Sequence, residues 1–170
     1  MVHLQNRART VPINKTIPAS KVMKTNLPLL NEVTAFLWAE ADMLDHSEYQ
    51  EWLGLWQEEG VYIIPIDPSL TDYENHLNYA YDNHEMRRLR VERLQNGEAI
   101  STTPKANIVH SVSRIRVLQE EGDEVVVRAA MNLREFRKEH LRHYTADLLF
   151  HLVKDADTGF KIKRKVVNLI

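Results

Sequence analysis

Residues 124–153 read EVVVRAAMNLREFRKEHLRHYTADLLFHLV, and residues 160–169 read FKIKRKVVNL. Both stretches are rich in β-branched and aromatic residues and mostly alternate between apolar and polar positions, which is the period of a strand with one buried face. Short turns that contain a glycine, at residues 120–123 and 155–159, have hairpin length. The C-terminal part of the chain therefore predicts a meander of antiparallel strands, over residues 108–118, 124–136, 141–153 and 160–169.

A helical pattern precedes these strands. Asn26 or Thr25 can cap a helix that has Pro28 in its first turn. The apolar residues that follow recur at helical spacing and form one stripe: Leu30, Val33, Phe36, Leu37, Ala41 and Leu44. Asp45 and His46 interrupt the stripe, so the first helix is expected to end near them.

A second helix is expected to start at Ser47, because Ser47 and Gln50 form a capping box. The densest apolar cluster of the sequence follows at helical spacing: Tyr49, Trp52, Leu53 and Trp56. Such a stripe is typical of a core, and part of it is also typical of an interface. Gly60 is a plausible stop, and residues 61–66 predict a strand in which Pro65 marks an edge position or the end.

The middle of the sequence predicts loops around a basic helix. Residues 67–81 are polar without a clear period, and residues 101–105 form a second loop. Between them, Asp82 and Glu85 make a capping box for a helix that ends at residues 96–97. Its basic residues make either a solvated face or a docking surface: Arg87, Arg88, Arg90 and Arg93.

The order of these elements predicts the fold class. Helices come first and antiparallel strands follow, which indicates an α+β fold with N-terminal helices packed on one face of a strongly curved, mostly antiparallel sheet. A curved sheet closed by helices is a cone with an internal cavity. The 170 residues fit one domain. We expect an extended arm at residues 1–27 and a single domain at residues 28–170.

The composition excludes several classes of function. The sequence contains no Cys, which removes disulfides, thiolate catalysis, Cys-ligated zinc and Cys-bound iron–sulfur clusters. Its five glycines form no phosphate loop and no dinucleotide-binding fingerprint. No apolar run approaches the roughly 18 residues that a membrane span needs, and the N-terminus has no signal-peptide core. The expected location is the cytoplasm.

The charge distribution is asymmetric. A formal net charge of -2 gives no case for binding to nucleic acid or to a membrane. The first 31 residues nevertheless hold five of the 22 basic residues and none of the 24 acidic ones. We expect this arm either to be solvated or to lie on an acidic surface, of this chain or of a partner.

The internal cavity of a cone can host acid–base chemistry. A fold of this kind would place a small set of polar side chains around it: Asp42, Asp45, Tyr62, His110 and Asp147. Each also fits a structural role as a helix end, a packed ring or a paired charge, so we predict no catalytic residue. His140 and His143, three residues apart, would face opposite sides of a strand and could meet only in the loop before it. No H-E-x-x-H motif occurs. We therefore predict no metal ligand.

One block of the sequence resembles a known family. Residues 40–45 read EADMLD, residues 49–56 read YQEWLGLW, and residues 61–65 read VYIIP. The block is similar to the opening of the small (β) subunits of aromatic-ring-hydroxylating dioxygenases, which runs E-A-x-L-L-D, Y-x-x-W-L-x-L and then Y-x-x-P. RVERL at residues 90–94 and STTP at residues 101–104 are similar to the R-x-x-R-L and S-E-x-P stretches of that family.

The resemblance covers the chain from about residue 29 to its end. FKIKRKVV at residues 160–167 is similar to the closing strand of the family. The sequence departs from the pattern at Ile100, where the family often has Trp, and at residues 105–110, where KANIVH replaces an arginine-rich S-R-T-R-H. The chain is identified on these grounds as a divergent member.

The resemblance implies a fold and a place in a larger enzyme. The fold is the cone shared with nuclear transport factor 2, scytalone dehydratase and ketosteroid isomerase. A trimer of small subunits caps a trimer of large α subunits, and the α subunit carries a Rieske [2Fe-2S] cluster and a mononuclear Fe(II). Electrons come from NADH through a reductase, sometimes with a ferredoxin. The complex adds both atoms of O₂ to an aromatic ring and forms a cis-dihydrodiol, while the small subunit is structural.

Three readings of the function follow. As a structural subunit, the chain would supply trimer contacts and an α-subunit docking face, with the N-terminal arm and a set of interface residues: Arg87, Arg90, Arg93, Ser101, Pro104 and His110. As a stand-alone dehydratase or isomerase, it would use a His/Asp pair in the pocket without a metal. The third reading is a small-ligand binding or scaffold module. The resemblance favours the structural subunit.

Overall fold

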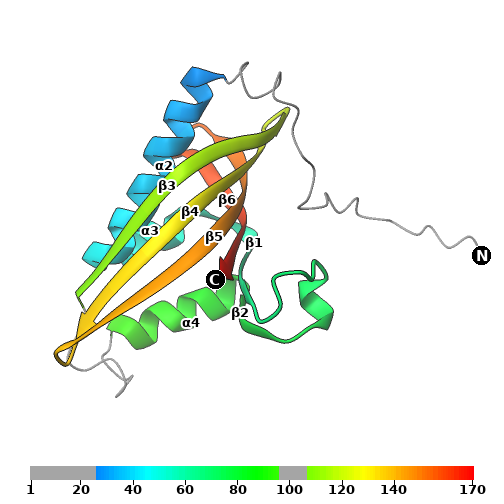
Figure 1. The fold of residues 1–170 in the computed structure, drawn as a ribbon. Coiled ribbons are helices and arrows are strands. Elements are labelled where there is room, and N and C mark those ends of the chain that lie inside the picture. Colours follow the sequence, from blue (N-terminus) through cyan, green and yellow to red (C-terminus); the bar gives the residue numbers. More distant parts are fainter. Residues whose placement is uncertain (1–25, 96–106) are drawn as a thin grey trace, which may run out of the picture.

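The computed structural model describes residues 26–95 and 107–170 (Figure 1). Nearly all of the expected arm at residues 1–27 lies outside these ranges. The expected helix end at residues 96–97 and the loop at residues 101–105 also lie outside them.

The described residues form helices packed on one open sheet of six strands. The elements follow in the order α2 (Leu27–His46), α3 (Tyr49–Gly54), β1 (Trp56–Pro65), the 3₁₀ turn η1 (Tyr73–Asn75), β2 (Asn78–Asp82), α4 (His84–Gln95), β3 (Asn107–Glu121), β4 (Glu124–Arg137), β5 (His140–Asp155) and β6 (Gly159–Leu169). The strand order is β2-β1-β6-β5-β4-β3, and only the β1–β6 pair is parallel among these strands. The predicted α+β class and the four C-terminal strands are confirmed.

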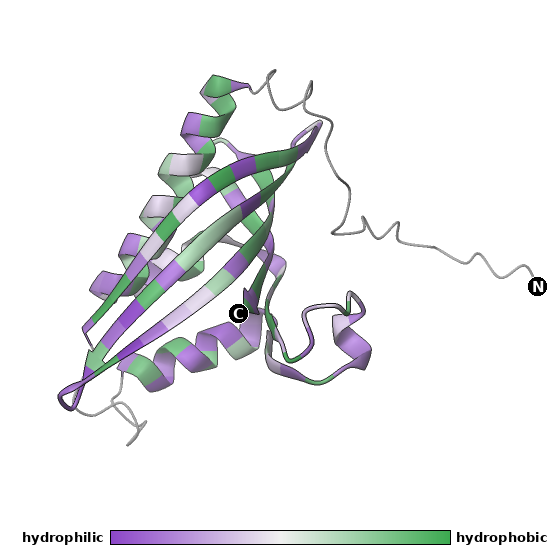
Figure 2. Cartoon of the chain, viewed as in Figure 1, coloured by the Kyte–Doolittle hydropathy of each residue, from purple (hydrophilic) through white to green (hydrophobic). Residues whose placement is uncertain are grey.

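The core lies between α2 and the inner face of the sheet. The long strands curve across α2 in Figure 1, and they alternate between hydrophobic and hydrophilic residues in Figure 2. Val127 and Leu148 point to the inner face and are buried with Leu37 of α2. The rings of Phe36 and Phe160 meet edge to face, with centroids 5.6 Å apart. Because side chains alternate along a strand, the residues between the inner ones make up the outer face.

Helix α2 begins as its sequence predicts. The side chain of Asn26 accepts a hydrogen bond from the backbone N–H of Leu29 at 3.2 Å, and Pro28 lies in the first turn. The end differs from the prediction at Ser47, which closes α2 with a φ of 64° instead of opening the next helix. The backbone N–H of Glu48 donates to the Met43 carbonyl at 2.8 Å. Glu48 is the N-cap of α3 without a side-chain bond, so the predicted capping box is wrong.

The boundary between α3 and β1 also differs from the prediction. Helix α3 ends at Gly54, and Trp56 already belongs to β1. The cause is tertiary, because the backbone N–H of Ile162 donates to the Leu55 carbonyl at 2.7 Å and draws the chain into the sheet. Gly60, expected as a helix stop, lies inside β1 at an irregularity in the pairing with β6. Pro65 ends β1 as expected, but β1 is not an edge strand.

The stretch expected as one long loop contains a strand. Residues 78–82 form β2, which pairs antiparallel with β1 at the edge of the sheet. Helix α4 is then capped by Asn83, whose side-chain oxygen accepts from the N–H of Met86 at 3.0 Å. Asp82, expected as the cap, is instead buried at the end of β2. The capping prediction was wrong by one residue, because Asp82 has an ion partner further along α4.

Gly60 offers a test of the β1 irregularity. A Cβ atom at this position would lie 2.7 Å from the Ile162 carbonyl oxygen and 2.9 Å from that of Gln57. Both contacts involve backbone atoms, so Gly60→Ala should lower the free energy of unfolding by about 1–3 kcal/mol through overpacking. A Cβ at Gly54 meets nothing within 4 Å, so Gly54→Ala should change stability by less than about 1 kcal/mol. Urea unfolding of both variants makes the comparison, and equal losses would contradict the close approach of β6.

Candidate functional site

The interior of the cone holds a buried ion pair. The Nζ atom of Lys165 on β6 lies 2.7 and 2.9 Å from the two carboxylate oxygens of Glu40 on α2. The indole N–H of Trp52 donates to the same carboxylate at 2.8 Å. Glu40 is 2 % exposed and Lys165 is 4 % exposed. This pair was not predicted from the sequence, although Glu40 lies four residues after Phe36 and three after Leu37 on the buried stripe.

Aromatic rings close off the space around the ion pair. The Lys165 ammonium lies 5.1 Å from the centroid of Phe150 and 5.9 Å from that of Tyr62. Burial, together with the nearby Glu40 carboxylate, raises the pKa of the Tyr62 hydroxyl, so Tyr62 stays protonated and is suited to packing. Two surface pockets, of about 410 and 490 Å³, are lined by other residues. Neither of these two pockets is lined by Glu40, Lys165 or Tyr62.

Two of the acid–base candidates, Asp45 and His110, contact each other where the end of α2 lies against strand β3. The Nδ1 atom of His110 lies 2.5 Å from Oδ1 of Asp45, and the backbone N–H of His110 donates to Oδ2 of Asp45 at 2.9 Å. Nearby, the indole N–H of Trp38 donates to the Val112 carbonyl at 3.1 Å. His110 and Val112 belong to β3, an edge strand of the sheet. Asp45 and Trp38 thus satisfy backbone groups on the free edge of β3, which is how proteins protect such edges.

Asp42 lines the same surface pocket of about 490 Å³ as Asp45 and His110, and it makes an exposed ion pair with His46 one helical turn away, at 3.2 Å. The remaining candidates lie elsewhere. Asp147 pairs with Arg114 on the outer face. His140 and His143 are both exposed on β5. Among residues 26–95 and 107–170, no group of three or more His, Cys, Asp or Glu side chains could hold a metal ion. Asp42, Asp45 and His110 thus share one surface pocket, whereas Tyr62 and Asp147 do not line it.

The arginines of α4 have different environments. Arg87 is 1 % exposed and donates to the carbonyls of Gly60 and Asp82, with its guanidinium 4.3 Å from the Trp56 ring. Burial lowers the pKa of Arg87 to about 10. It is a core residue, so its expected place on a docking face is wrong.

Arg90 and Arg93 remain on the surface of α4. The Nε of Arg90 lies 2.6 Å from Oδ2 of the buried Asp82, and its second contact to that carboxylate is 3.0 Å. Arg93 is exposed and forms no ion pair within the described part of the chain. An interface role for Arg90, Arg93 and His110 stays a prediction, and Ser101 and Pro104 lie outside the described residues.

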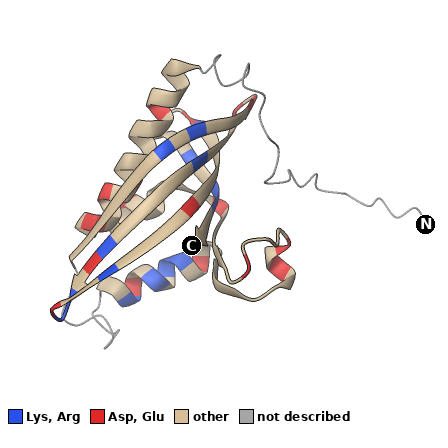
Figure 3. Cartoon of the chain, viewed as in Figure 1, with Lys and Arg blue, Asp and Glu red and all other residues tan. Residues whose placement is uncertain are grey.

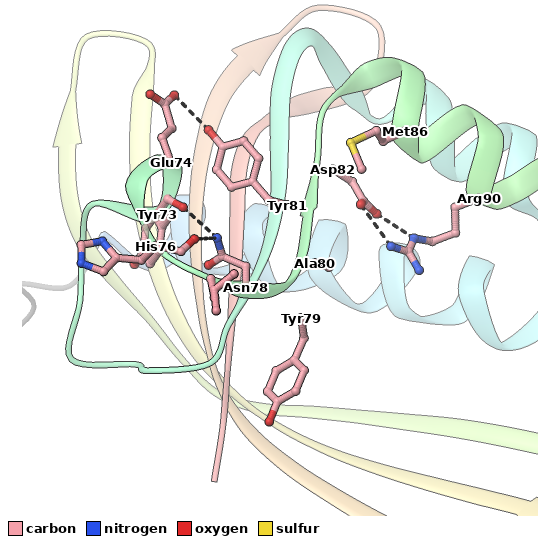
Figure 4. Close-up of a pocket in the computed structure, with 11 residues that line it drawn as sticks. Tyr73, Glu74, His76, Asn78, Tyr79, Ala80, Tyr81, Asp82, Met86 and Arg90 are labelled. Atoms are coloured by element: carbon pink, nitrogen blue, oxygen red, sulfur yellow. Dashed lines mark hydrogen bonds and ion pairs between the residues drawn. The ribbon is translucent and has the colours of Figure 1, made fainter.

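A surface that the sequence did not indicate lies beside these arginines. Leu77 is 83 % exposed and Tyr79 is 69 % exposed, and Met86 and Leu89 of α4 are also exposed. Leu77, Tyr79 and Met86 line the pocket of about 410 Å³ together with Arg90, which Figure 4 shows paired with Asp82. Aromatic residues, Met and Arg are enriched in protein interfaces. We call the four apolar residues with Arg90 and Arg93 the β2–α4 surface.

Comparison with known proteins identifies the family of this chain. The model of the family described as ring hydroxylating beta subunit matches residues 39–170. The chain belongs to this family. It is 27% identical over 143 residues to the 2-halobenzoate 1,2-dioxygenase small subunit of Burkholderia cepacia, covering 81% of this chain and 86% of that one. It is 32% identical over 102 residues to the p-cumate 2,3-dioxygenase small oxygenase component of Pseudomonas putida, covering 59% and 57%.

Solved structures agree on the fold. The beta subunit of benzoate 1,2-dioxygenase from Burkholderia mallei superposes with a TM-score of 0.69 at 21% identity, covering 92% of this chain and 93% of that one. The expected resemblance is confirmed, and family membership favours a dioxygenase subunit over a stand-alone dehydratase or isomerase. No helix in the described ranges is both long and apolar enough to span a membrane.

The outer face of β5 carries a half-buried histidine. His151 pairs with Arg164 across the β5–β6 ladder. Burial lowers the pKa of His151 to about 4, and the positive charges of Arg164 and Lys163 act in the same direction against the opposing carboxylate of Glu124. His151 is therefore neutral in the folded protein at pH 7.

Because the ion pair is buried, removing its cation alone should destabilise the protein more than removing both charges. Lys165→Met should cost about 3–5 kcal/mol in the free energy of unfolding, because it leaves the Glu40 carboxylate buried without its cation. Adding Glu40→Gln should recover most of that loss, since the amide oxygen still accepts from Trp52. Urea unfolding measures both variants. A loss below about 1 kcal/mol for Lys165→Met would show that the pair is not buried as described.

The lowered pKa of His151 predicts that the free energy of unfolding falls in acid. The unfolded chain takes up the proton near pH 6.5, whereas the folded chain takes it up near pH 4. This contribution is complete above pH 6.5 and falls by up to about 3 kcal/mol between pH 6.5 and 4. His151→Gln should flatten that part of the curve in urea unfolding at a series of pH values. An unchanged slope in the variant would contradict the assignment.

Proposed function

We propose that the chain is the structural β subunit of the terminal oxygenase of a multicomponent dioxygenase that hydroxylates aromatic rings. The observation that carries the proposal is the family match over residues 39–170. The interior supports it, because the buried charges of Glu40 and Lys165 are paired with each other. In this role the chain supplies shape and contacts, and the chemistry takes place on a partner.

The partner is a large α subunit with a Rieske [2Fe-2S] cluster and a mononuclear Fe(II). Electrons reach it from NADH through a reductase, with a ferredoxin in some systems. A Rieske cluster needs two Cys and two His ligands. This chain contains no Cys, so the cluster would belong to another chain. The relatives named above act on a halobenzoate and on p-cumate, which supports an aromatic substrate and a role in aromatic catabolism in the cytoplasm.

The assembly is an α3β3 hexamer, in which three copies of this chain form a trimer that caps three α subunits. The β2–α4 surface is the proposed docking face for the α subunit. Its support is the set of exposed apolar side chains on β2, on α4 and at Leu77 just before β2, of which Leu77 is 83 % exposed. They lie next to the cationic side chains of Arg90 and Arg93. A stable subunit exposes apolar patches of this kind mainly where a partner covers them.

Co-expression with the large chain tests the role. The full chain purified alone should be a trimer without iron, and the co-purified complex should contain both chains and iron, by native mass spectrometry and metal analysis. A stable monomer that binds no larger chain and catalyses a dehydration or isomerisation would overturn the proposal.

Variants test the docking face. Leu77→Asp/Met86→Asp should reduce co-purification of the large chain at least tenfold, because it places two charges in an apolar contact. Leu141→Asp is the control, since Leu141 is 57 % exposed on β5, outside that surface. If the control abolishes co-purification and the double variant does not, the docking face lies elsewhere.

A further inference from the structure

Two arginines face each other on the outer side of the sheet. Arg116 on β3 and Arg128 on β4 are direct partners across the antiparallel ladder. Their neighbours Val117 and Val127 pack in the core, so Arg116 and Arg128 lie on the opposite, outer face. Both are half-buried, and within residues 26–95 and 107–170 neither pairs with a carboxylate. We call them the arginine pair.

Like charges directly opposite each other across two strands are unfavourable. The cations around the arginine pair are mostly compensated within the chain: Arg114 pairs with Asp147, Lys154 with Glu120, and Lys163 with Glu124. Arg134 and Arg164 have no ion partner among the described residues either, but they are exposed to water. The arginine pair is therefore the place on this face where a carboxylate from outside would remove the most repulsion.

The opposite charge is gathered at the other end of the sheet. Residues 66–77 contain Asp67, Asp72 and Glu74 but no Lys or Arg, and the three acids are exposed. Figure 3 shows red segments but no blue ones in this loop, whereas β3 and β4 carry blue segments along their length and red ones near their ends. We call it the acidic loop.

The acids of this loop have no cationic partner among the described residues. Their hydrogen bonds come from neutral donors: the N–H and hydroxyl of Ser69 to Asp67, the amide of Asn75 to Asp72, and the hydroxyl of Tyr81 to Glu74. None of the three forms an ion pair with Lys or Arg in the described part of the chain.

One row of residues connects the two charged regions. Arg116 pairs with Arg128, Arg128 with Leu149, and Leu149 with Val166 across successive strands. Val166 is buried with Ile63 and with Tyr73 of the acidic loop. The outer face is therefore basic at its β3 end, and at its β1–β2 end the three acids of the acidic loop outnumber the nearby cation Arg164, whose charge acts on Tyr73 and Tyr81. A surface with opposite charges at its two ends fits a second copy head to tail, which is the heterologous contact that closes a ring.

We propose that the acidic loop of one copy docks on the arginine pair of the next copy in the β-subunit ring. The proposal rests on the proposed function, because the second copy is the neighbouring subunit of the β trimer. The contact places Asp72 and Glu74 against Arg116 and Arg128, and it neutralises four charges that the single chain leaves uncompensated.

Charge reversal on each side tests the contact. Arg116→Glu/Arg128→Glu and Asp72→Lys/Glu74→Lys should each weaken self-association of the full chain at least tenfold, measured by native mass spectrometry and by light scattering over a dilution series. The quadruple variant that carries both pairs of changes should restore association. Arg134→Glu is the matched control, because Arg134 lies on the same face of β4 six residues away, and it should leave association unchanged. Added salt should weaken the wild-type trimer.

The outcomes separate the two proposals. A wild-type chain that stays monomeric, a quadruple variant that does not reassociate, or an equal effect of Arg134→Glu would overturn the docking contact. Circular dichroism checks folding, and the acidic-loop variant is independent of any misfolding of the strand variant because its changes lie in an exposed loop. If the wild type co-purifies with the large chain while charge reversal has no effect, the contact is wrong and the subunit role stands. If no large chain binds, the subunit role itself fails.

Discussion

The ion pair between Glu40 and Lys165 joins the two layers of the molecule at their centre. Glu40 lies on α2, and Lys165 lies on β6, which is flanked by β1 and β5. A charge pair buried this deeply costs desolvation energy, and it is retained only when its geometry and its further hydrogen bonds are good. Here Trp52 supplies a further bond, and the rings of Phe150 and Tyr62 exclude water. The pair forms only if α2 is positioned and rotated so that Glu40 faces the sheet, and if the alternation of side chains along β6 points Lys165 toward α2.

The same interaction bears on function. A cone of this type encloses a volume between helix and sheet, and the residues that point into it decide what the protein does. In this chain Glu40, Lys165 and Trp52 contact one another there. The groups that remain available for recognition are on the outside: the apolar side chains of β2 and α4, and the charged groups at the two ends of the outer face. The interior stabilises the subunit, and the surfaces are left to make contacts.

Local sequence patterns predicted most of the helices and strands. The predictions were wrong at element boundaries that depend on contacts with residues distant in the sequence. The α2 cap at Asn26 and the four long strands follow from side-chain spacing alone. The end of α3 does not, because Leu55 bonds to Ile162 over a hundred residues later in the chain. Ser47 has the chemistry of a cap but adopts a left-handed conformation that closes the previous helix. Strand β2 is too short and too polar to show a period, and only its pairing with β1 defines it.

The candidate site shows the same division. Asp45 and His110 were both named from the sequence, yet their contact spans 65 positions and could not be inferred from spacing. Arg87 looked like a surface cation because its helix is basic throughout, and only the carbonyl groups of β1 and β2 explain its burial. The charge pattern of loop 66–77 was visible in the sequence, but its relation to Arg116 and Arg128 required the register of five strands.

The parallel pairing of β1 with β6 has a consequence for how the chain folds. β6 lies between β1 and β5, so until residues 159–169 have left the ribosome the sheet exists as two separate parts, β2–β1 and β5–β4–β3. Glu40 must also wait for a partner 125 residues away. Contacts of such sequence separation slow folding and leave hydrophobic surface exposed in the meantime. The apolar surface and the strand edges of β1 and β5 that β6 covers therefore stay exposed on the nascent chain until residues 159–169 are free to pair.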